Sequence, residues 1–452
     1  TVAHSLGSAP GMIIIKNTGV TDPWAVYHRA NTAAPQTDYL VLNTTAATVD
    51  SAAWWNDTAP TSSVFTVGTD HSVNANGENY IAYIFAHNNS DGEFGPDADQ
   101  DIIKCGSFTG NGSTNGPEID LGFEPQWVML KRGTGTGGWF MFDNMRGVST
   151  GGNDQWLRAN TADAEQAAAL IDFNSTGFKI TNGSGDVNSS GTMIYMAIRR
   201  GPLNPPTAGT EVFVPAVQGV SGANPTYPTG IVTDFSITTA PSQTSDKKVM
   251  TRLLGATELV ASDTSVEGSY SNAVWDYMNG WGNEANQTDK YSWAWKRAPS
   301  YFDVVAYTGN STAGRTVSHN LGVAPEMMWV RKRSSAGLWR VYHKGLNGGT
   351  NPEQYGINLD GTAAEYDLNT LWNDTAPTAS VFTLGTQGNV NFNNSTYIAY
   401  LFTTLAGISK LGSVTHSGSS TDVNCGFSNG ARFVMLKRTD ATGGWYIWDS
   451  VR

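Results

Sequence analysis

Residues 307–339 read YTGNSTAGRTVSHNLGVAPEMMWVRKRSSAGLW, and this stretch decides the fold because it returns along the chain with changes. Related stretches occupy residues 108–139 (FTGNGSTNGPEIDLGFEPQWVMLKRGTGTGGW), 1–24 (TVAHSLGSAPGMIIIKNTGVTDPW) and 414–445 (VTHSGSSTDVNCGFSNGARFVMLKRTDATGGW). Each keeps one order of parts: a polar turn, a short strand, a second turn, an apolar strand that carries Lys or Arg at its end, a third turn and a Trp. Such self-similarity predicts an array of similar units.

The composition indicates an all-β protein. The 452 residues include 50 Gly, only 15% are charged, and 11% are aromatic. Asn, Ser, Thr and Gly separate short apolar runs, which is typical of many strands joined by turns. A single sheet would leave one apolar face uncovered, so we predict tandem antiparallel β-sandwich units, jelly-roll or lectin-like, of about 100 residues each.

The repeat landmarks give the domain organisation. Leu6, Leu121, Leu321 and Cys425 each precede a Gly, at spacings of 115, 200 and 104 residues. The double spacing predicts a further unit whose sequence departs from the pattern, either a diverged copy or an inserted linker domain. Because Thr1 and Arg452 fall inside repeats, we expect a segment of a longer chain with truncated first and last units. The five predicted units are 1–87, 101–202, 203–299, 300–404 and 405–452.

The fourth unit shows the expected elements most clearly. Alternation of apolar and polar residues, the period of a half-buried strand, recurs through it. Ala-rich runs with helical spacing indicate one short helix in 160–171 and one in 361–371. The predicted strands are 304–307, 316–320, 327–332, 339–343, 355–359, 381–384 and 397–402.

The two cysteines occupy apolar positions of the repeat. Cys105 takes the place of Leu411, since each precedes Gly-Ser, and Cys425 takes the place of Leu121 and Leu321. Free Cys behaves as a small hydrophobic residue, so both are predicted to be buried and unpaired. A disulfide between them is the alternative, and it would need their units to face each other.

An acidic loop is the candidate metal site. Asp97, Asp99 and Asp101 form an Asp-x-Asp-x-Asp run, preceded by Asp91 and Glu93. Clustered carboxylates suit calcium, although the Gly that an EF-hand loop needs is replaced by Ile102. The alternative is a solvated linker between units, in which case the protein has no cofactor.

The histidines of the repeat form a second pattern. His4 and His28 are 24 residues apart, as are His319 and His343. Two histidines on neighbouring strands suit a metal, but closed zinc sites have four ligands and no others accompany these. We therefore interpret them as hydrogen-bonded, partly buried side chains near strand ends.

Basic residues end the apolar strands throughout. Their regular placement predicts a solvated rim that discourages pairing between sheet edges, with an anion site as the alternative. The runs are Lys131-Arg132, Arg199-Arg200, Lys296-Arg297, Arg331-Lys332-Arg333 and Lys437-Arg438.

The 15 Trp residues are the most suggestive feature for function. Trp24, Trp139, Trp339 and Trp445 recur at one place in the repeat, which predicts core positions. Exposed aromatic faces beside Asn and Asp are typical of sugar-binding surfaces. Tyr277, Asn279 and Trp281 alternate in a loop-rich stretch of the third unit, and they are the predicted ligand-binding residues.

Charge and motifs exclude several functions. A net charge of −12 without a basic stripe argues against nucleic acid as a partner. No apolar run approaches the roughly 18 residues of a membrane span, so membrane insertion is not expected. The sequence has no Gly-x-Ser-x-Gly elbow and no repeated Cys-His pairing, and nothing marks out a carboxylate pair. We therefore predict that the protein is not an enzyme.

Several motifs resemble a repeated domain of long virion proteins in tailed bacteriophages, mostly of marine and cyanobacterial hosts. They include HSLGSAP (4–10), WNDTAPTSSVFT (55–66), FDVVAYTGN (302–310) and YIAYLF (397–402). The resemblance covers the first, second, fourth and fifth units and the end of the third. It implies a tail fibre or other structural part of a virion appendage, located outside the cell, with other virion proteins and host surface polysaccharide as partners.

The resemblance leaves alternatives open. A polysaccharide-degrading enzyme of the same appendage is one, and a capsid or decoration protein without a ligand is another. Fibres are commonly three-fold, so a homo-oligomer such as a trimer is expected, although no coiled-coil heptads impose it.

Overall fold

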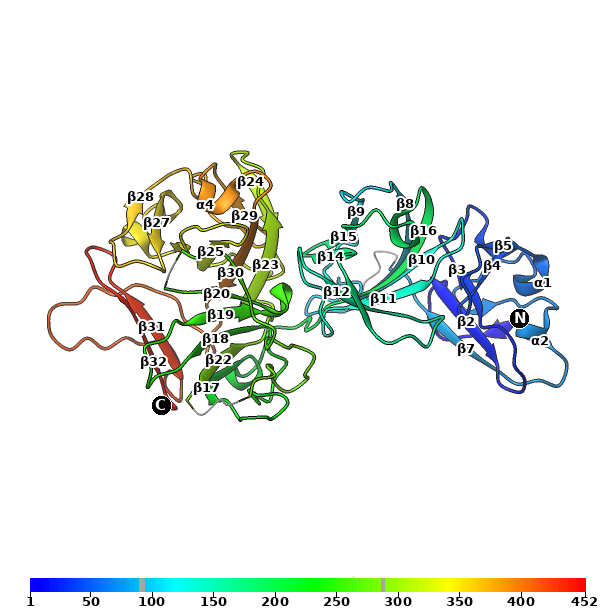
Figure 1. Cartoon of the computed structure of the whole chain (residues 1–452), viewed down its shortest axis with the longest axis horizontal. Helices are drawn as coiled ribbons and strands as arrows, with labels where there is room; N and C mark the ends of the chain where they lie inside the picture. Colours follow the sequence, from blue (N-terminus) through cyan, green and yellow to red (C-terminus); the bar gives the residue numbers. More distant parts are fainter. Residues whose placement is uncertain (89–93, 263, 286–288) are drawn as a thin grey trace. The chain divides into compact units, whose positions relative to one another are not determined.

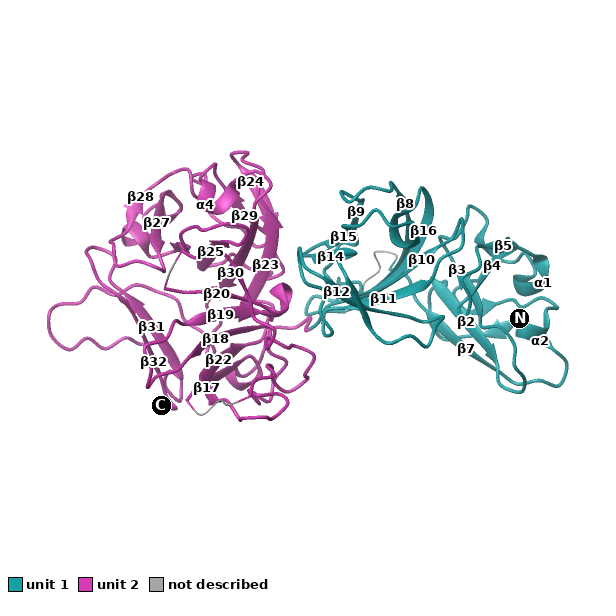
Figure 2. Cartoon of the chain, in the orientation of Figure 1, with its two compact units in different colours: residues 1–201 teal, residues 202–452 magenta. Residues whose placement is uncertain are grey.

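The computed structural model describes residues 1–88, 94–262, 264–285 and 289–452. The chain forms two compact units, Thr1–Gly201 and Pro202–Arg452 (Figure 1, Figure 2). Both consist of antiparallel sheets, which confirms the predicted all-β class. The division into five units is finer than these two compact units and stays a prediction. The α-helices of the described residues are single turns: α1 (Ala52–Trp55), α2 (His71–Asn74), α3 (Gly185–Asn188) and α4 (Gly388–Asn391).

The first compact unit contains two large and two small sheets. The five-stranded sheet has the order β5 (Val49–Asp50), β4 (Asp38–Val41), β3 (Ala25–His28), β2 (Met12–Asn17) and β7 (Tyr80–Phe85). The six-stranded sheet has the order β13 (Gln166–Ala168), β12 (Asp154–Arg158), β11 (Trp139–Asp143), β10 (Pro125–Arg132), β16 (Gly191–Arg199) and β8 (Ile103–Gly110). The small sheets are β1 (Val2–Ala3) with β6 (Val64–Phe65), and β14 (Ile171–Asn174), β15 (Gly177–Ile180) and β9 (Glu118–Asp120).

The second compact unit contains two six-stranded sheets and two hairpin-sized ones. The first has the order β17 (Phe213–Gln218), β22 (Tyr291–Trp295), β18 (Phe235–Thr239), β19 (Lys248–Thr251), β20 (Thr257–Val260) and β21 (Gly268–Ser269). The second has the order β23 (Phe302–Thr308), β30 (Thr396–Phe402), β25 (Met327–Lys332), β26 (Arg340–His343), β27 (Tyr355–Asn358) and β28 (Tyr366–Asp367). The small sheets are β24 (Arg315–Ser318) with β29 (Val381–Leu384), and β31 (Phe433–Lys437) with β32 (Trp445–Asp449).

The three six-stranded sheets share one strand order. In each, the last strand in sequence lies between the first and the second, and the remaining strands follow in sequence order. The five-stranded sheet has the same order without a first strand. The sheet that starts at β17 lies in residues 203–299, where the sequence departs from the repeat pattern, and it nevertheless has this order.

The large sheets are buried on both faces. In β2, Ile13 and Ile15 pack in a core with Trp55 and Phe65, which belong to the helix turn and small sheet beside it. Met12 and Ile14 point the other way, into a core with Met129, Trp139 and Ile194 of the neighbouring six-stranded sheet. Successive strand residues point to opposite faces, so burial on both sides explains why β2 is a continuous apolar run.

One hydrogen bond recurs between neighbouring sheets. The indole Nε1 of Trp139 donates to the carbonyl oxygen of Val41 at 3.0 Å, and that of Trp339 donates to Val260 at 2.8 Å. Trp445 donates to Asn358 at 2.9 Å. Each acceptor ends the strand that lies next to the edge strand of its sheet, which is β4, β20 or β27. The repeated Trp therefore joins one sheet to the next within each compact unit.

The strands expected in the fourth unit are present, and β25 and β29 have the predicted bounds. The predicted helices in 160–171 and 361–371 are wrong, because those runs contain the edge strands β13 and β28. Pairing of these strands with β12 and β27 overrides the helical propensity of the alanines in the two runs.

The cysteines are both free, as predicted. Cys105 is buried, but the prediction for Cys425 needs correction because this residue is only half-buried, in a segment without regular structure. The apolar position that it occupies in the repeat is not enclosed by a core at this point of the fold.

Candidate functional site

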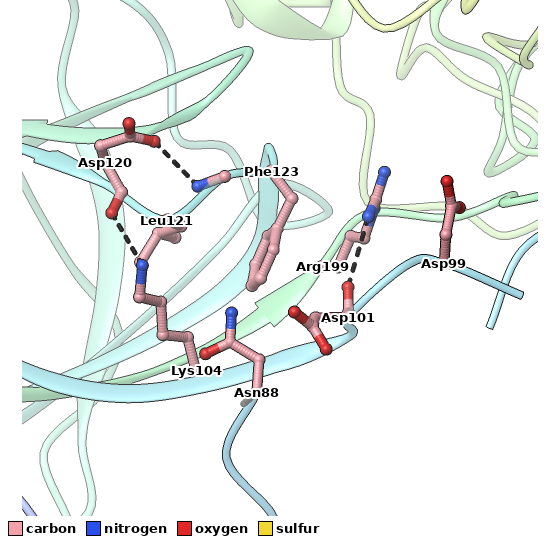
Figure 3. A pocket seen from close by; sticks show the side chains of 9 residues that line it. Asn88, Asp99, Asp101, Lys104, Asp120, Leu121, Phe123 and Arg199 are labelled. Carbon is pink, nitrogen blue, oxygen red and sulfur yellow. Dashed lines mark hydrogen bonds between the residues drawn. The ribbon is translucent and has the colours of Figure 1, made fainter. Parts of the chain in front are cut away.

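A polar cavity of about 340 Å³ lies in the first compact unit, where the start of β8 and the end of β16 approach the turn between β9 and β10. Figure 3 shows that its side chains come from several separate segments. The lining residues are Asn88, Asp99, Asp101, Lys104, Asp120, Leu121, Gly122, Phe123 and Arg199.

The turn after β9 forms one wall. Asp120 Oδ1 accepts a hydrogen bond from the backbone N–H of Gly122 at 2.8 Å, and the Asp120 carbonyl accepts one from Lys104 Nζ at 3.0 Å (Figure 3). Gly122 has a φ of +78°, a conformation that glycine adopts without steric cost. The Leu-Gly pair of the repeat therefore forms a sharp turn next to Asp120, whose carbonyl holds the side chain of Lys104 from β8.

Arg199 forms the opposite wall. Its Nη1 donates to the backbone carbonyl of Asp101 at 3.3 Å, and its guanidinium lies 5.8 Å from the ring centre of Phe123. Burial lowers the pKa of Arg199, with a smaller effect of the same sign from Arg200, while Asp99 and Asp101 act in the opposite direction. An arginine stays protonated despite such a shift, so its charge faces these carboxylates.

The cavity offers charged donors and acceptors but little apolar surface. Among the described lining residues, three carboxylates face two cations, and the side chain of Phe123 is buried and so offers no free face for stacking. The lining residues carry no hydroxyl, thiol or imidazole, which are the usual partners of a nucleophile–base pair. The arrangement suits a small polar ligand that both donates and accepts hydrogen bonds.

Among the described residues, the carboxylates of Asp97, Asp99 and Asp101 do not converge into the predicted calcium site. Asp97 is exposed and lies outside the lining of the cavity. Within the described ranges, no group of three or more His, Cys, Asp or Glu side chains is placed to hold a metal. Arg199 provides the positive charge beside Asp99 and Asp101 instead. Asp91 and Glu93 lie outside the described residues.

Trp281 is not the exposed sugar-binding platform that the sequence predicted. Its side chain is fully buried, with ring centres 4.8 Å from Tyr227 and 5.0 Å from Trp275, and its Nε1 donates to Ser292 Oγ at 3.0 Å. A Cβ on the neighbouring Gly280 would lie 2.3 Å from the Tyr227 carbonyl, so the loop packs closely there. The flanking glycines were the sequence signal for this close approach.

The two other predicted ligand-binding residues remain at the surface. Tyr277 is half-buried and Asn279 is exposed, and the side chain of Met278 between them is 71% exposed. The Asn279 carbonyl accepts a hydrogen bond from the backbone N–H of Gly230 at 2.8 Å. This bond holds the loop while the Asn279 side chain stays accessible.

The histidines have structural roles. His319 Nε2 lies 3.2 Å from the Thr378 carbonyl, and its Nδ1 accepts from the Leu321 N–H at 3.3 Å. His4 makes the same pair of contacts, with Thr61 and Leu6. His28 is buried, with its Nε2 3.0 Å from the Tyr195 carbonyl. The interpretation of these residues as hydrogen-bonded side chains near strand ends agrees with these contacts.

Several basic strand ends are buried, which corrects the predicted solvated rim. Lys131 lies under Trp139, with Nζ 6.0 Å from the ring centre, and burial lowers its pKa to about 8. Arg331 lies 5.6 Å from the Trp339 ring in the same way. The signal in the sequence is the fixed separation of the cation and the Trp, which places them opposite each other on paired strands, as with Lys131 and Trp139.

Asp154 of β12 provides a pH-sensitive site in the first compact unit. Its Oδ2 accepts from the backbone N–H groups of Leu170 and Ile171 at 2.8 and 2.9 Å. Burial raises its pKa from 3.8 to about 7, although these bonds oppose the shift. The native state therefore holds a proton between pH 4 and 7 that the unfolded chain has released.

We expect this proton to make stability fall as pH rises from about 4 through 7. At 1.36 kcal/mol per pKa unit, the loss is at most about 4 kcal/mol. The measurement is urea unfolding of wild type and Asp154→Asn at pH 6 and pH 8.5. The difference in the free energy of unfolding between wild type and Asp154→Asn should change between these pH values. An unchanged difference would contradict the assignment of the proton to Asp154. His28, whose pKa burial lowers to about 4, has the opposite pH dependence and is common to both proteins.

Comparison with known proteins adds one family. A family model described as a domain of unknown function, DUF7483, matches residues 1–202 and 260–452. No curated protein matches the chain.

The described part of the chain has no helix long and apolar enough to cross a membrane. The unmatched residues 203–259 include β17, β18 and β19, which belong to a sheet with the shared strand order.

Proposed function

The chain belongs to the family of the domain of unknown function DUF7483, and from this starting point we propose that it is a structural and adhesive part of a virion appendage. In this proposal the protein is a tail-fibre component of a tailed bacteriophage. It contacts surface glycans of the host and does not cleave them. Its partners are other virion proteins and host polysaccharide, and its location is the outside of the virion.

The observation that carries the proposal is the recurrence of one sheet order together with one indole-to-carbonyl bond. The same Trp contact joins neighbouring large sheets at Val41 and Val260, and it joins the small β31–β32 sheet to a large sheet at Asn358. Repetition of one building block with one kind of junction is typical of proteins that extend in one direction. Such an array also presents weak binding sites in several copies, whose avidity exceeds the single-site affinity.

The resemblance to phage virion proteins supports the same assignment. It rests on stretches such as FDVVAYTGN at 302–310, which forms β23 and the turn that follows it. The net charge of −12 disfavours nucleic acid and other polyanions as partners. Neutral or mixed-charge polysaccharide remains suitable as a binding partner.

The polar cavity is the first candidate for glycan contact. The carboxylates of Asp99 and Asp101 accept hydrogen bonds from sugar hydroxyls in this proposal, and Lys104 and Arg199 donate to them. Hydrogen bonds to charged groups contribute about 1.5–3 kcal/mol, enough for a weak site that avidity strengthens. The surface at Tyr277 and Asn279 is the second candidate, because a half-buried tyrosine and an exposed asparagine lie two residues apart in one loop.

The test is binding of the fluorescently labelled chain to intact bacteria from hosts of tailed phages, cyanobacteria among them, and to their extracted surface polysaccharide. We expect saturable binding that Asp99→Asn with Asp101→Asn weakens about tenfold, which corresponds to one lost charged hydrogen bond. Tyr277→Ala with Asn279→Ala tests the second surface. Met278→Ala is the matched control, since this side chain is exposed between them.

The size of the polysaccharide after incubation separates adhesion from catalysis. Unchanged chain length with saturable binding supports the proposal. Shortened polysaccharide would show an enzyme, and absence of binding to every target would remove the adhesive role.

A further inference from the structure

The polar cavity lies at a connection that is longer in the first compact unit than in the second. In each compact unit the last strand of one large sheet leads to the first strand of the next, β7 to β8 and β22 to β23. The first connection takes residues 86–102, and the second takes residues 296–301. The longer connection carries Asp99 and Asp101, which line the cavity.

In the second compact unit, the short connection closes over the corresponding Leu-Gly turn. The backbone N–H of Ser300 donates to the Leu321 carbonyl at 2.7 Å. Asp303 accepts from the Asn320 N–H at 2.8 Å and pairs with the buried guanidinium of Arg297. The charged groups at this connection are therefore satisfied by other parts of the fold.

Three positions that frame the cavity differ in charge between the two compact units. The first position is the second residue of the first strand, β8 or β23, and the second position precedes the Leu-Gly turn. The third directly follows the residue that pairs with the start of that first strand. The pairs of equivalent residues are Lys104 and Asp303, Asp120 and Asn320, and Arg199 and Thr403.

The cations of the cavity hold main-chain oxygens rather than carboxylates. Lys104 donates to the Asp120 carbonyl at 3.0 Å, and Arg199 donates to the Asp101 carbonyl at 3.3 Å (Figure 3). The carboxylates of Asp99 and Asp101 form no hydrogen bond or salt bridge with any residue that the structure describes. Asp101 is half-buried and Asp99 is exposed. The cavity thus offers two free carboxylates beside two partly engaged cations.

We propose that the cavity selects an amino sugar whose nitrogen is a free ammonium group without an acyl substituent. The ammonium donates to Asp101, and the more exposed Asp99 adds negative charge. Ring hydroxyls accept from Lys104 and Arg199, and the Asn88 amide donates or accepts. Charge-assisted hydrogen bonds are about twice as strong as neutral ones, so the ammonium decides the selectivity. This inference deepens the glycan contact proposed above and rests on it for the choice of a sugar as ligand.

The lining disfavours other small ligands. An acidic sugar would meet three carboxylates, and a metal ion would be repelled by Lys104 and Arg199. An acetylated nitrogen loses its charge and places an apolar methyl group among charged side chains. The volume of about 340 Å³ is near the lower end of small-ligand sites, about 300–1,000 Å³, which suits about one sugar ring.

The first experiment measures binding of glucosamine, N-acetylglucosamine and glucose to the full chain by saturation-transfer NMR at pH 6, where an amine is protonated. The three sugars differ at one ring position. We expect glucosamine to bind at least about tenfold tighter than the other two, with the preference reduced in about 0.5 M NaCl. Equal affinities, a preference for N-acetylglucosamine, or no glucosamine binding up to about 50 mM would overturn the proposal.

Substitutions then assign the preference to the cavity. Asp99→Asn with Asp101→Asn keeps the size of both side chains and should lower the affinity for glucosamine to that for glucose. Asp97→Asn is the matched control, because this aspartate is exposed in the same segment but lies outside the lining. It should keep the preference. A preference that survives the double substitution, or that Asp97→Asn removes equally in a protein with native circular dichroism, would contradict a site in the cavity.

A polysaccharide comparison separates this inference from the adhesive function. The amines of extracted host polysaccharide are acetylated with acetic anhydride, and binding is measured before and after. Binding that acetylation leaves unchanged would keep the adhesive function and overturn the amino-sugar assignment. Glucosamine binding that the double substitution removes, without binding to any host cell, would support the amino-sugar site and remove the adhesive function.

Discussion

Replacing Asp303 with Ala is expected to lower the free energy of unfolding of the second compact unit by about 3–5 kcal/mol. Asp303 is 1% exposed, and both of its oxygens are engaged. Oδ1 accepts from Arg297 Nε, and Oδ2 accepts from the Asn320 backbone N–H at 2.8 Å. The substitution leaves the buried guanidinium of Arg297 without this carboxylate, and its desolvation is then no longer offset.

The effect should be large because the pair belongs to a buried network. The backbone N–H of Arg297 donates to Asp234 Oδ2 at 2.8 Å, and Asp234 Oδ1 accepts from Arg252 Nε at 3.1 Å. Arg252 is itself 4% exposed, and burial lowers its pKa. The network thus links the end of β22 to the start of β23, so its loss weakens the connection between two large sheets.

The measurement is chemical unfolding followed by tryptophan fluorescence. Asp303→Asn should cost less than Asp303→Ala, since its amide oxygen can still accept the Asn320 N–H. Asp440→Ala is the control, because the Arg438–Asp440 pair is exposed and surface pairs contribute little. Equal stability of Asp303→Ala and Asp440→Ala would contradict the buried-network argument.

The strand positions were predictable from the sequence because they depend on local chemistry. Turn residues mark the ends of β25, and its apolar residues mark its length, so its bounds are those expected. Trp139 and Trp339 are buried, as their fixed place in the repeat predicted, but Trp24 and Trp445, predicted as core from the same place, are only half-buried. The helix predictions failed at β13 and β28 because the pairing partner, rather than the segment's own composition, decides the conformation there.

The environment of the basic strand ends was not predictable in this way. The period of a strand tells which side chains share a face, but it does not tell what covers that face. Lys131 and Arg331 share a face with a Trp that packs on a neighbouring sheet, so they are buried rather than solvated. Only the arrangement of sheets reveals this second core.

The polar cavity was not predictable, because it depends on contacts between residues that are far apart in the sequence. Arg199 donates to the Asp101 carbonyl although the two residues are 98 positions apart. The sequence therefore did not show that an arginine lies beside the aspartate run, and the run alone suggested calcium. Trp281 shows the same limit, since its partners Tyr227 and Ser292 belong to other segments of the chain. Composition identified the residue types of a site but not their neighbours.

Trp339→Ala is the second substitution with a large expected effect, a loss of about 3–5 kcal/mol in the stability of the second compact unit. The side chain is fully buried, packs among residues of both large sheets, and donates to the Val260 carbonyl at 2.8 Å. The truncation opens a cavity and removes the donor for that carbonyl. It also uncovers the Arg331 guanidinium, which lies 5.6 Å from the ring.

Two further variants separate the contributions of packing and the hydrogen bond. Trp339→Phe keeps most of the ring but removes the indole donor, so a smaller loss of about 1–3 kcal/mol is expected from the unsatisfied carbonyl of Val260. Trp24→Ala should cost least, because this Trp occupies the same repeat position but is only partly buried. Hydrogen exchange in β20 should rise in Trp339→Ala if the Trp joins the sheets, since β20 ends at the acceptor. Exchange that rises only in β25 and β26 would instead mean that Trp339 stabilises its own sheet and that the junction is held by the surrounding apolar side chains.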